Sequence, residues 1–337
     1  MLKENILVTG GAGYIGSHVV RDLYEKGYNP IVYDNLSTGR RENILNGEFV
    51  QGNINDRSLV SKTIREYRIR NVIHFAASIV VEESVSRPLD YYENNSANTF
   101  RLVQTCIENN IEHFVFSSTA AVYGIPEKVP VPETAPMLPI NPYGKSKVVT
   151  EMLLQDVSAA YPGFHYIALR YFNVAGADSQ ARIGQNYKKP THLMTLALRT
   201  ALGDYPGLKI FGSDYNTPDG TAVRDYIHID DLSHAHLLAL EYLKSQKQSR
   251  IFNCGYGIGH SVAEVVKAAQ EVTGIQFHTI PSDRRPGDPP QLVADSRCIQ
   301  TELGWKPRFN DLHYIIKTAW EWEKKIMEAR RSSEKRK

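Results

Sequence analysis

Two residues four positions apart, Tyr143 and Lys147, could together carry out proton transfer. They stand in Asn141-Pro142-Tyr143-Gly144-Lys145-Ser146-Lys147, where a helix is expected to begin, and residues i and i+4 share one helical face. A nearby ammonium favours the phenolate form of tyrosine. Lowering a phenol pKa from about 10 to about 7 takes about 4 kcal/mol, much of which one close cation can supply in a partly dry site. Because an isolated Tyr-x-x-x-Lys recurs by accident, the surrounding sequence must decide whether the pair is functional.

A glycine-rich turn near the N-terminus predicts a dinucleotide site. Gly10, Gly13 and Gly16 follow the apolar run Asn5-Ile6-Leu7-Val8-Thr9. The first glycine permits a tight turn, the second allows close approach of a pyrophosphate, and the third lets the next helix pack against the sheet. Asp34 ends the second apolar run, where a carboxylate can bind an adenosine ribose and would repel a 2′-phosphate. The pattern favours NAD over NADP, although Arg40 and Arg41 lie near enough in sequence to leave NADP open.

Short apolar runs alternate with amphipathic segments over the first half of the chain. We predict strands at 5–9, 30–34, 48–51, 71–75, 113–117 and 164–170, and helices near 14–26, 56–67, 88–110 and 142–161. This alternation predicts an α/β fold with a doubly wound parallel sheet, a Rossmann domain covering residues 1–175.

The rhythm changes after about Gly176. Segment 176–222 is loop-rich and polar, and helices are expected near 230–245, 261–273 and 311–328. We expect a smaller mixed α/β domain over 176–325 that binds substrate, with some segments returning to the first domain. Residues 326–337 are expected to form a charged, solvated tail. The cleft between the two domains is the expected active site.

Composition excludes several classes of protein. The chain has 337 residues and a formal net charge of only +2, so we expect no nucleic-acid partner. Its three cysteines are widely spaced, which argues against a disulfide framework or a cysteine-rich metal site, and we predict no metal. With no leader segment and no stretch that could span a bilayer, we predict a cytoplasmic protein without membrane association.

Taken together, several motifs resemble the extended short-chain dehydrogenase/reductase family, and within it the UDP-glucose 4-epimerases. The resemblance covers nearly everything up to residue 325, in motif order and spacing as well as content. The motifs are the glycine turn with Asp34, His74-Phe75-Ala76-Ala77, Ser117-Ser118-Thr119-Ala120-Ala121-Val122-Tyr123-Gly124, Tyr143 with Lys147, Leu169-Arg170-Tyr171-Phe172-Asn173, Val223-Arg224-Asp225-Tyr226-Ile227-His228 and Arg284-Arg285-Pro286-Gly287-Asp288.

The resemblance implies NAD-dependent interconversion of UDP-glucose and UDP-galactose through a transient 4-keto sugar. It implies Tyr143 as the base, Lys147 as the residue that holds the nicotinamide ribose and helps to lower the Tyr143 pKa, and Thr119 as a hydroxyl that steers the proton. The implied cofactor contacts are Gly10, Gly13, Tyr14, Ile15, Gly16, Asp34, Asn35, Asn53, Ile54, Phe75, Ala76, Ala77, Ser117, Tyr143, Lys147 and Tyr171.

The resemblance also assigns the UDP-sugar end of the site. Arg224 and Arg285 would clamp the diphosphate, a task suited to the planar guanidinium fork. Leu193 and Phe211 would flank the uracil, although both could equally be core residues. The implied substrate contacts are Thr119, Tyr143, Phe172, Asn173, Leu193, Phe211, Arg224, Arg285, Asp288 and Leu292.

Three positions depart from the family pattern at the cofactor. Asn53 replaces an aspartate, Ile79 stands where some members have a lysine, and Ala97 occupies a position often held by a cofactor-contacting asparagine. We expect looser retention of NAD from the last two changes.

Two alternatives to an epimerase remain. A nucleotide-sugar 4,6-dehydratase or decarboxylase shares the first oxidation, but a dehydratase places an acid and a base directly after the Ser/Thr, where this chain has Ala120-Ala121. A non-catalytic NAD-binding regulator would not need Thr119, Tyr143 and Lys147 together.

The resemblance bears on substrate breadth and assembly as well. Four places after Asp288, Leu292 replaces a tyrosine that restricts the sugar pocket, so we expect UDP-GlcNAc and UDP-GalNAc to be accepted. Helices 88–110 and 142–161 would form a four-helix interface in a homodimer.

Overall fold

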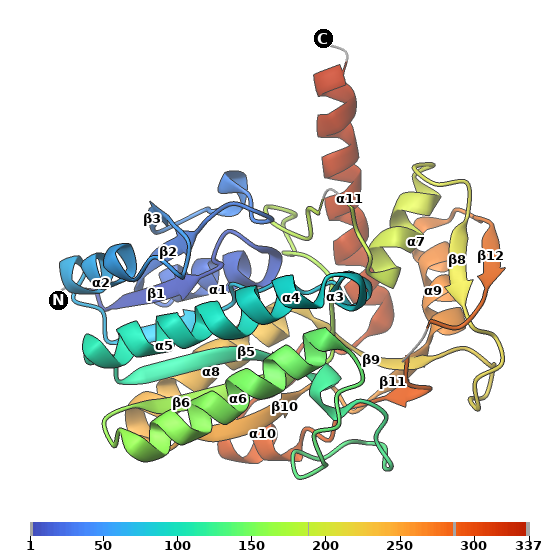
Figure 1. The fold of residues 1–337 in the computed structure, drawn as a ribbon. Coiled ribbons are helices and arrows are strands. Elements are labelled where there is room, and N and C mark those ends of the chain that lie inside the picture. Colours follow the sequence, from blue (N-terminus) through green and yellow to red (C-terminus); the bar gives the residue numbers. More distant parts are fainter. Residues whose placement is uncertain (1–2, 188, 286–287, 335–337) are drawn as a thin grey trace.

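The computed structural model describes residues 3–187, 189–285 and 288–334 and contains a large parallel sheet (Figure 1). Its seven strands are ordered β10-β6-β5-β4-β1-β2-β3, and every neighbouring pair is parallel. This is the doubly wound Rossmann architecture that the sequence predicts. The strands are β1 (Asn5–Thr9), β2 (Asn29–Asp34), β3 (Glu48–Gln51), β4 (Asn71–His74), β5 (His113–Thr119), β6 (His165–Tyr171) and β10 (Arg250–Cys254).

Helices cover both faces of this sheet. Alternate β1 residues face opposite layers: Ile6 and Val8 pack with α1 and α8, whereas Leu7 packs with α2, α5 and α6. This two-sided burial explains why the central strands are nearly continuous apolar runs. The helices of this part are α1 (Tyr14–Glu25), η1 (Arg41–Asn43), α2 (Arg57–Glu66), α3 (Val81–Ser86), α4 (Pro88–Tyr91), η2 (Tyr92–Ala97), α5 (Asn98–Glu108), η3 (Ala120–Tyr123), α6 (Pro142–Ala160), α8 (Ile229–Gln246) and α10 (Arg297–Glu302).

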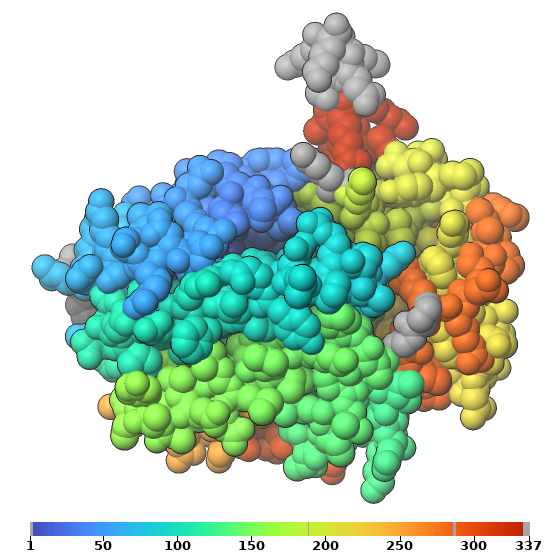
Figure 2. Space-filling view, viewed as in Figure 1, coloured from blue at the N-terminus to red at the C-terminus, as the bar shows by residue number. Residues whose placement is uncertain are grey.

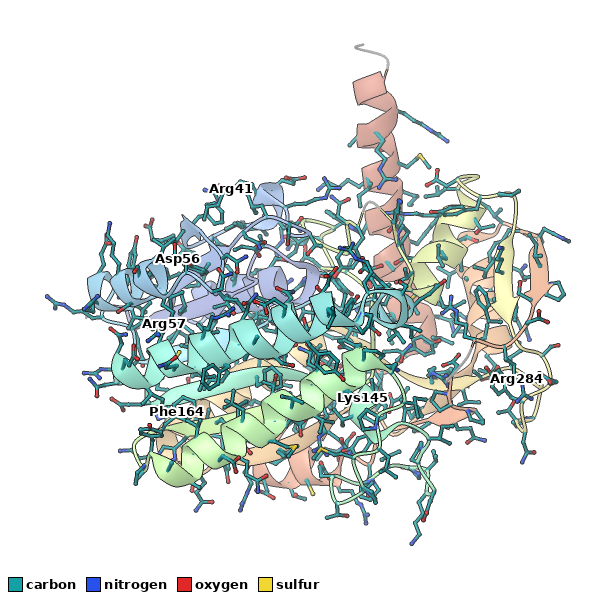
Figure 3. The ribbon with its side chains drawn as sticks, in the orientation of Figure 1. Arg41, Asp56, Arg57, Lys145, Phe164 and Arg284 are labelled. Carbon is teal, nitrogen blue, oxygen red and sulfur yellow. The ribbon has the colours of Figure 1, made fainter. Side chains whose placement is uncertain are left out.

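Helix α6 begins where the sequence predicts. The Asn141 side chain accepts a hydrogen bond from the Gly144 amide at 2.8 Å, and Pro142 occupies the first helical position. Both features favour a helix start at this point, since proline lacks the amide that would go unpaired there. Tyr143 and Lys147 therefore lie in the first two turns, at the end marked by Lys145 in Figure 3.

The helix predicted at 88–110 is not uniform. It is divided into α4, the π-helical turn η2 and α5, and it ends at Glu108. The π-helical geometry accompanies a buried amide, because Asn95 accepts from the Ser78 amide at 2.7 Å and donates to the Ser78 carbonyl at 2.9 Å. Such turns change which side chains face a neighbouring loop, and apolar periodicity does not reveal them.

The smaller part of the structure is mixed α/β, as predicted. The segment expected to be loop-rich is more regular than predicted, because residues 193–201 form a helix and residues 208–211 form a strand. Strand β9 pairs with β7, β11 and β13, and β8 pairs with β12. The elements are β7 (Asn173–Ala175), α7 (Leu193–Ala201), β8 (Leu208–Phe211), β9 (Val223–His228), β11 (Gly259–Ser261), α9 (Val262–Thr273), β12 (Thr279–Ser282), β13 (Gln291–Leu292) and α11 (Leu312–Glu334).

Two segments after residue 176 belong to the large sheet. Strand β10 pairs with β6, and α8 packs on the face that α1 also covers.

The structure also differs from the tail expected from residue 326, because α11 continues to Glu334. Trp322 and Ile326 are buried with Ala177, and this apolar contact holds the helix against the body of the protein. Among the described residues, no helix has the length and apolarity that a bilayer crossing requires.

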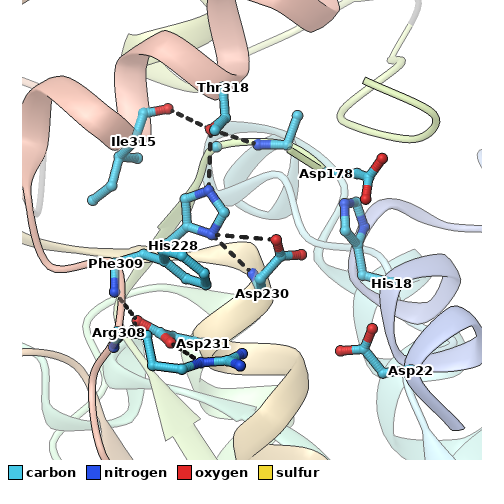
Figure 4. A network of polar contacts seen from close by, with 12 residues as sticks. His18, Asp22, Asp178, His228, Asp230, Asp231, Arg308, Phe309, Ile315 and Thr318 are labelled. Carbon is cyan, nitrogen blue, oxygen red and sulfur yellow. Dashed lines mark hydrogen bonds and ion pairs between the residues drawn. The ribbon is translucent and has the colours of Figure 1, made fainter. Parts of the chain in front are cut away.

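A buried polar cluster joins the two parts (Figure 4). Arg21 on α1 contacts Asp178 and Asp230, each at 2.8 Å. Figure 4 shows His228 beside Thr318 of α11. The His228 Nε2 and Thr318 Oγ1 atoms are 3.0 Å apart. These contacts connect α1 and α8 with the segment after β7, and β9 with α11.

Candidate active site

A cavity of about 770 Å³ opens at the carboxyl ends of the parallel strands. Strand order reverses between β1 and β4, which is where doubly wound sheets bind ligands. The walls of the cavity include the glycine turn, the end of β2 and the loop after β4. The residues predicted to contact the cofactor that line it are Gly10, Gly13, Tyr14, Ile15, Gly16, Asp34, Asn35, Asn53, Ile54, Phe75, Ala76, Ala77, Ser117 and Tyr171.

The glycine turn leaves no room for side chains. Gly10 has φ of +71°, and a Cβ there would lie 2.6 Å from the Ala76 amide nitrogen. A Cβ on Gly16 would collide with the Gly10 carbonyl oxygen. Gly13 is the N-cap of α1 and offers no side-chain cap to the helix amides. The turn therefore fits an anionic group of a dinucleotide at the start of α1.

Asp34 is held in place beside the glycine turn. Its carboxylate accepts hydrogen bonds from the amides of Ala12 at 3.0 Å and Leu36 at 2.8 Å. Burial raises the Asp34 pKa, and these two bonds oppose the rise. A carboxylate oxygen has a second lone pair, so ribose hydroxyls can still bind. Arg40 and Arg41 also line the cavity, but Arg40 donates to the Asn186 carbonyl at 2.8 Å and Arg41 covers Phe49.

The three predicted catalytic residues converge beside Ser117. Thr119 closes β5, and its side chain hydrogen-bonds the Tyr143 phenol. Lys147 donates from Nζ to the Ser117 carbonyl at 2.9 Å and lies over the Phe116 ring. Thr119 and Tyr143 are each 9% exposed and Lys147 is 3% exposed, so the set lies in a dry environment beside the cavity.

Burial dominates the electrostatics of this set. It raises the Tyr143 pKa, and the hydrogen bond from Thr119 opposes the rise. It lowers the Lys147 pKa to about 7, against which Glu151 acts. Lys147, which is expected to help lower the phenol pKa, thus has a lowered pKa of its own in this structure. Desolvation penalises both charged forms, and the lysine ammonium is directed at a backbone carbonyl.

The turn after Thr119 carries no proton-transfer group. Ala120 is buried, and the Ala121 amide donates back to the Thr119 hydroxyl at 3.2 Å. Tyr123 is the first titratable residue in this turn, and its hydroxyl is engaged by Arg170 at 2.9 Å and Asn253 at 2.6 Å. Thr119 and Tyr143 are thus the groups of this turn and helix start that can exchange a proton with a ligand.

The residues predicted to bind substrate lie mainly on the smaller part. Arg224 on β9 forms an ion pair with Asp288, and Arg285 lies over the Phe211 ring at 4.0 Å. Phe172 and Leu292 share a small apolar cluster with Ala120. Asn173 begins β7 and Leu193 begins α7. Pro286 and Gly287 of the predicted motif lie outside the described residues.

Comparison with known proteins settles the family. Residues 6–255 match the model of the NAD-dependent epimerase/dehydratase family. This chain belongs to that family.

Its relatives in the epimerase/dehydratase family include UDP-glucose 4-epimerases. The one from Azospirillum brasilense is 51% identical over 325 residues, covering 96% of this chain and 93% of the relative. The structure of the Brucella ovis UDP-glucose 4-epimerase in complex with NAD superposes with a TM-score of 0.92 at 43% identity, covering 94% and 98% of the two chains. The UDP-Glc/GlcNAc 4-epimerase of Campylobacter jejuni matches at 45% identity with a TM-score of 0.84, covering 96% and 99%.

The epimerase/dehydratase fold also places residues in the cavity that sequence reasoning missed. Asn94 lines it and donates to the Ser78 hydroxyl at 2.9 Å. Asn94 therefore supplies an asparagine to this wall three positions before Ala97, and the looser retention of NAD expected from Ile79 and Ala97 stays a prediction. The adjacent Asn94 and Asn95 were visible in the sequence as polar candidates. Which of them faces the cavity depends on the π-helical turn, which the sequence does not reveal.

Residues 186, 187, 189, 191 and 192 form another wall that sequence reasoning missed. Tyr187 and His192 line the cavity, and their rings stack with centroids 6.1 Å apart. Ile79, one of the three departures, lines it as well. Segment 186–192 carries no motif of its own, since it comes from a connection that the sequence identified only as irregular.

Proposed function

We propose that the protein interconverts UDP-glucose and UDP-galactose through a transient 4-keto sugar, with NAD as cofactor. One observation carries the proposal: a buried Thr119–Tyr143–Lys147 set beside a dinucleotide-sized cavity, followed by two alanines. The family relatives named above support the substrate class.

The chain's residues divide the proposed work. The glycine turn would hold the pyrophosphate, Asp34 the adenosine ribose, and Lys147 the nicotinamide ribose. NAD, when bound, supplies reversible hydride acceptance. Tyr143 takes the proton from the sugar 4-hydroxyl and later returns it, while Thr119 keeps the phenol oriented through its hydrogen bond. A positive charge close to Tyr143 would offset the burial that raises its pKa.

The turn after Thr119 favours epimerisation over elimination. A 4,6-dehydratase needs an acid and a base near C5 and C6 of the sugar. Ala120 and Ala121 have methyl groups there, and Tyr123 is engaged by Arg170 and Asn253. Because neither methyl group can remove the C5 proton, this turn favours returning the hydride to C4 over elimination.

The UDP end would be held by arginines from separate segments. Arg224 presents a guanidinium already oriented by Asp288, and Arg285 lies against Phe211. Planar guanidinium forks match phosphate oxygens, and an aromatic face can stack on uracil. We propose that Leu193 contacts the uracil, Asn173 a phosphate or the sugar, and Asp288 the ribose.

Substrate breadth would depend on Leu292. It is 8% exposed and packs with Phe172 and Val122, so its side chain limits the space beyond Thr119. A leucine is shorter than a tyrosine, and we propose that N-acetylated UDP-sugars are accepted. One structural relative is a UDP-Glc/GlcNAc 4-epimerase by its description.

We also propose a homodimer built on α5 and α6, which lie side by side across one face of the molecule (Figure 2). Apolar side chains stand exposed there, with Phe100 at 53% and Met152 at 54%. Exposed apolar area of this kind is typical of an interface. A cytoplasmic location remains part of the proposal and is compatible with three free cysteines.

The direct test is turnover of UDP-galactose by the purified protein. We expect UDP-glucose to form until both sugars reach equilibrium, with no net accumulation of NADH. Absence of product, with or without added NAD, would contradict the proposed function. Release of a 4-keto-6-deoxy sugar would instead indicate a dehydratase.

A further inference from the structure

A buried carboxylate lies one turn beyond Lys147 on the same face of α6. Glu151 and Arg170 are each 2% exposed and form an ion pair with Nη2 and Oε2 2.6 Å apart. Arg170 Nε adds bonds to both carboxylate oxygens, at 3.0 and 3.1 Å. A charged pair this deep requires complete hydrogen bonding, so its geometry is closely defined.

The same carboxylate reaches the strand that carries the catalytic partners. The Ser118 hydroxyl donates to Glu151 Oε1. The two residues that flank Ser118 on β5 contact Tyr143 and Lys147. The Ser117 carbonyl accepts from Lys147, and the Thr119 side chain hydrogen-bonds Tyr143. Glu151 therefore joins α6 to β5 between those two contacts.

The cluster continues toward the proposed sugar pocket. Arg170 Nη1 donates to the Tyr123 hydroxyl at 2.9 Å, and that hydroxyl donates to Asn253 at 2.6 Å. Asn253 in turn donates to the Val131 carbonyl at 2.8 Å, and the Val131 amide donates to the Val293 carbonyl, also at 2.8 Å. Val293 is the neighbour of Leu292. Hydrogen bonds thus connect Glu151 both to the end of β5 and to the neighbour of Leu292.

Burial and the Glu151 charge have opposite effects on the Lys147 pKa. Burial lowers the Lys147 pKa to about 7, and Glu151 raises it. Other titratable groups lie near this region: His74 on β4, Tyr91 on α4, Tyr123 on η3, and Tyr166 and Arg170 on β6. Burial lowers the His74 pKa to about 3 and raises the pKa of each of these tyrosines. Two further carboxylates lie one contact farther away: Glu83 accepts from the Tyr91 hydroxyl, and Glu133 accepts from the Asn253 amide. Glu151 is the carboxylate that acts on the Lys147 pKa.

We propose that Glu151 is a positioning residue for the catalytic set, which holds the end of β5 against α6 and keeps Lys147 cationic. Its effect on turnover rests on the proposed function. Its effect on Lys147 does not, because that effect depends only on the charge and contacts of the folded chain.

The test compares wild type with Glu151→Gln, which keeps the shape and removes the charge. The Lys147 Cε resonance in ¹³C-lysine-labelled protein, assigned with Lys147→Met, reports the lysine titration without added cofactor or substrate. We expect the Lys147 pKa to fall by about one unit or more, since a buried opposite charge is lost. In turnover of UDP-galactose we expect kcat to fall about tenfold or more, with KM within about threefold and the alkaline limb of the kcat profile moved to lower pH.

The matched control is Glu323→Gln. Glu323 forms an ion pair with Arg199 at 2.8 Å, both side chains being 3% exposed, but this pair joins α7 to α11 in the smaller part. We expect that change to lower Tm without moving the Lys147 titration. An unchanged Lys147 pKa in Glu151→Gln, or an equal change in both variants, would overturn the proposal.

Ser118→Ala separates position from charge, and it keeps the test decisive if Glu151→Gln does not fold. It removes the hydroxyl contact and leaves the carboxylate. We expect kcat to fall by about threefold to tenfold while the Lys147 titration stays within about 0.3 units of wild type. A wild-type kcat in Ser118→Ala would overturn the positioning role. If the wild-type protein is inactive while Glu151→Gln still lowers the Lys147 pKa, only the proposed function is contradicted.

Discussion

The Thr119 side chain hydrogen-bonds the Tyr143 phenol across the junction of β5 and α6, and both residues are nearly buried. This bond opposes the effect of burial on the phenol. It also restricts the direction of the phenol oxygen, because the tyrosine ring is attached to the first turn of a capped helix. The contact between these two residues is the basis of the first two predictions.

Replacing Tyr143 by phenylalanine removes the proposed base and little volume. We expect kcat for UDP-galactose to fall by about 10³-fold or more, since positioned acid–base groups contribute on this scale. Affinity for UDP, measured by calorimetry, should stay within about threefold because the ring remains. Loss of activity in step with loss of UDP affinity would point to a binding role instead.

Thr119→Val and Thr119→Ser form a matched pair. Valine keeps the branched shape but cannot hydrogen-bond, so the Tyr143 pKa rises and the acid limb of kcat/KM moves to higher pH. We expect about a tenfold to hundredfold loss of kcat/KM at neutral pH for valine and near wild-type values for serine. Equal profiles for the two variants would exclude a role for the hydroxyl.

Arg224→Lys tests the proposed diphosphate clamp. Lysine keeps the charge but loses the planar fork that pairs with Asp288 and would pair with phosphate. We expect KM for UDP-galactose to rise by about tenfold or more with kcat changed less than about threefold. The control is Arg284→Lys, an exposed arginine bound to Asp214 in the smaller part (Figure 3). A similar rise in both variants would argue against a specific clamp.

Leu292 tests the proposed breadth. We expect wild-type protein to interconvert UDP-GlcNAc and UDP-GalNAc, and Leu292→Tyr to lower kcat/KM for UDP-GlcNAc by about tenfold or more relative to UDP-galactose, because a larger ring would fill the space near Phe172. Product analysis by chromatography would measure both. Inactivity of wild type toward UDP-GlcNAc, with activity gained in Leu292→Ala, would show that leucine already closes the pocket.

Acid should destabilise the protein below about pH 6.5. Burial lowers the pKa of His228 and His236 to about 4, well below the ordinary value of 6.5. The unfolded chain therefore binds protons first as pH falls, and stability is lost between about pH 6.5 and 4, by about 1.4 kcal/mol per such histidine at pH 5.5. Urea unfolding at pH 7.5 and 5.5 measures the loss, which His236→Leu should reduce. A pH-independent midpoint over this range would contradict the prediction.

The sequence was most informative where local rules apply. Apolar runs and caps located most elements to within a few residues, because strand burial and helix capping depend on neighbours along the chain. Gly10 and Gly16 were assigned correctly as positions without side-chain space, since the turn they form is local. The separation of Tyr143 and Lys147 by four residues likewise placed both in one stretch of α6.

Contacts between distant segments were decided only by the tertiary structure. The return of β10 to the large sheet and the position of Tyr187 and His192 in the cavity wall have no signal in nearby residues. Asn94 faces the cavity because a π-helical turn changes the register of its helix, which apolar periodicity cannot resolve.

By itself, the sequence determined the family, the parallel sheet and the residues that could do chemistry, because residue type and spacing along the chain are enough for these. The tertiary structure decided the charge state of those residues. Lys147 was expected to help lower the pKa of Tyr143, whereas burial lowers the pKa of the lysine itself, and Glu151 opposes that effect. Desolvation depends on everything that packs around a group, and that packing exists only once the chain is folded.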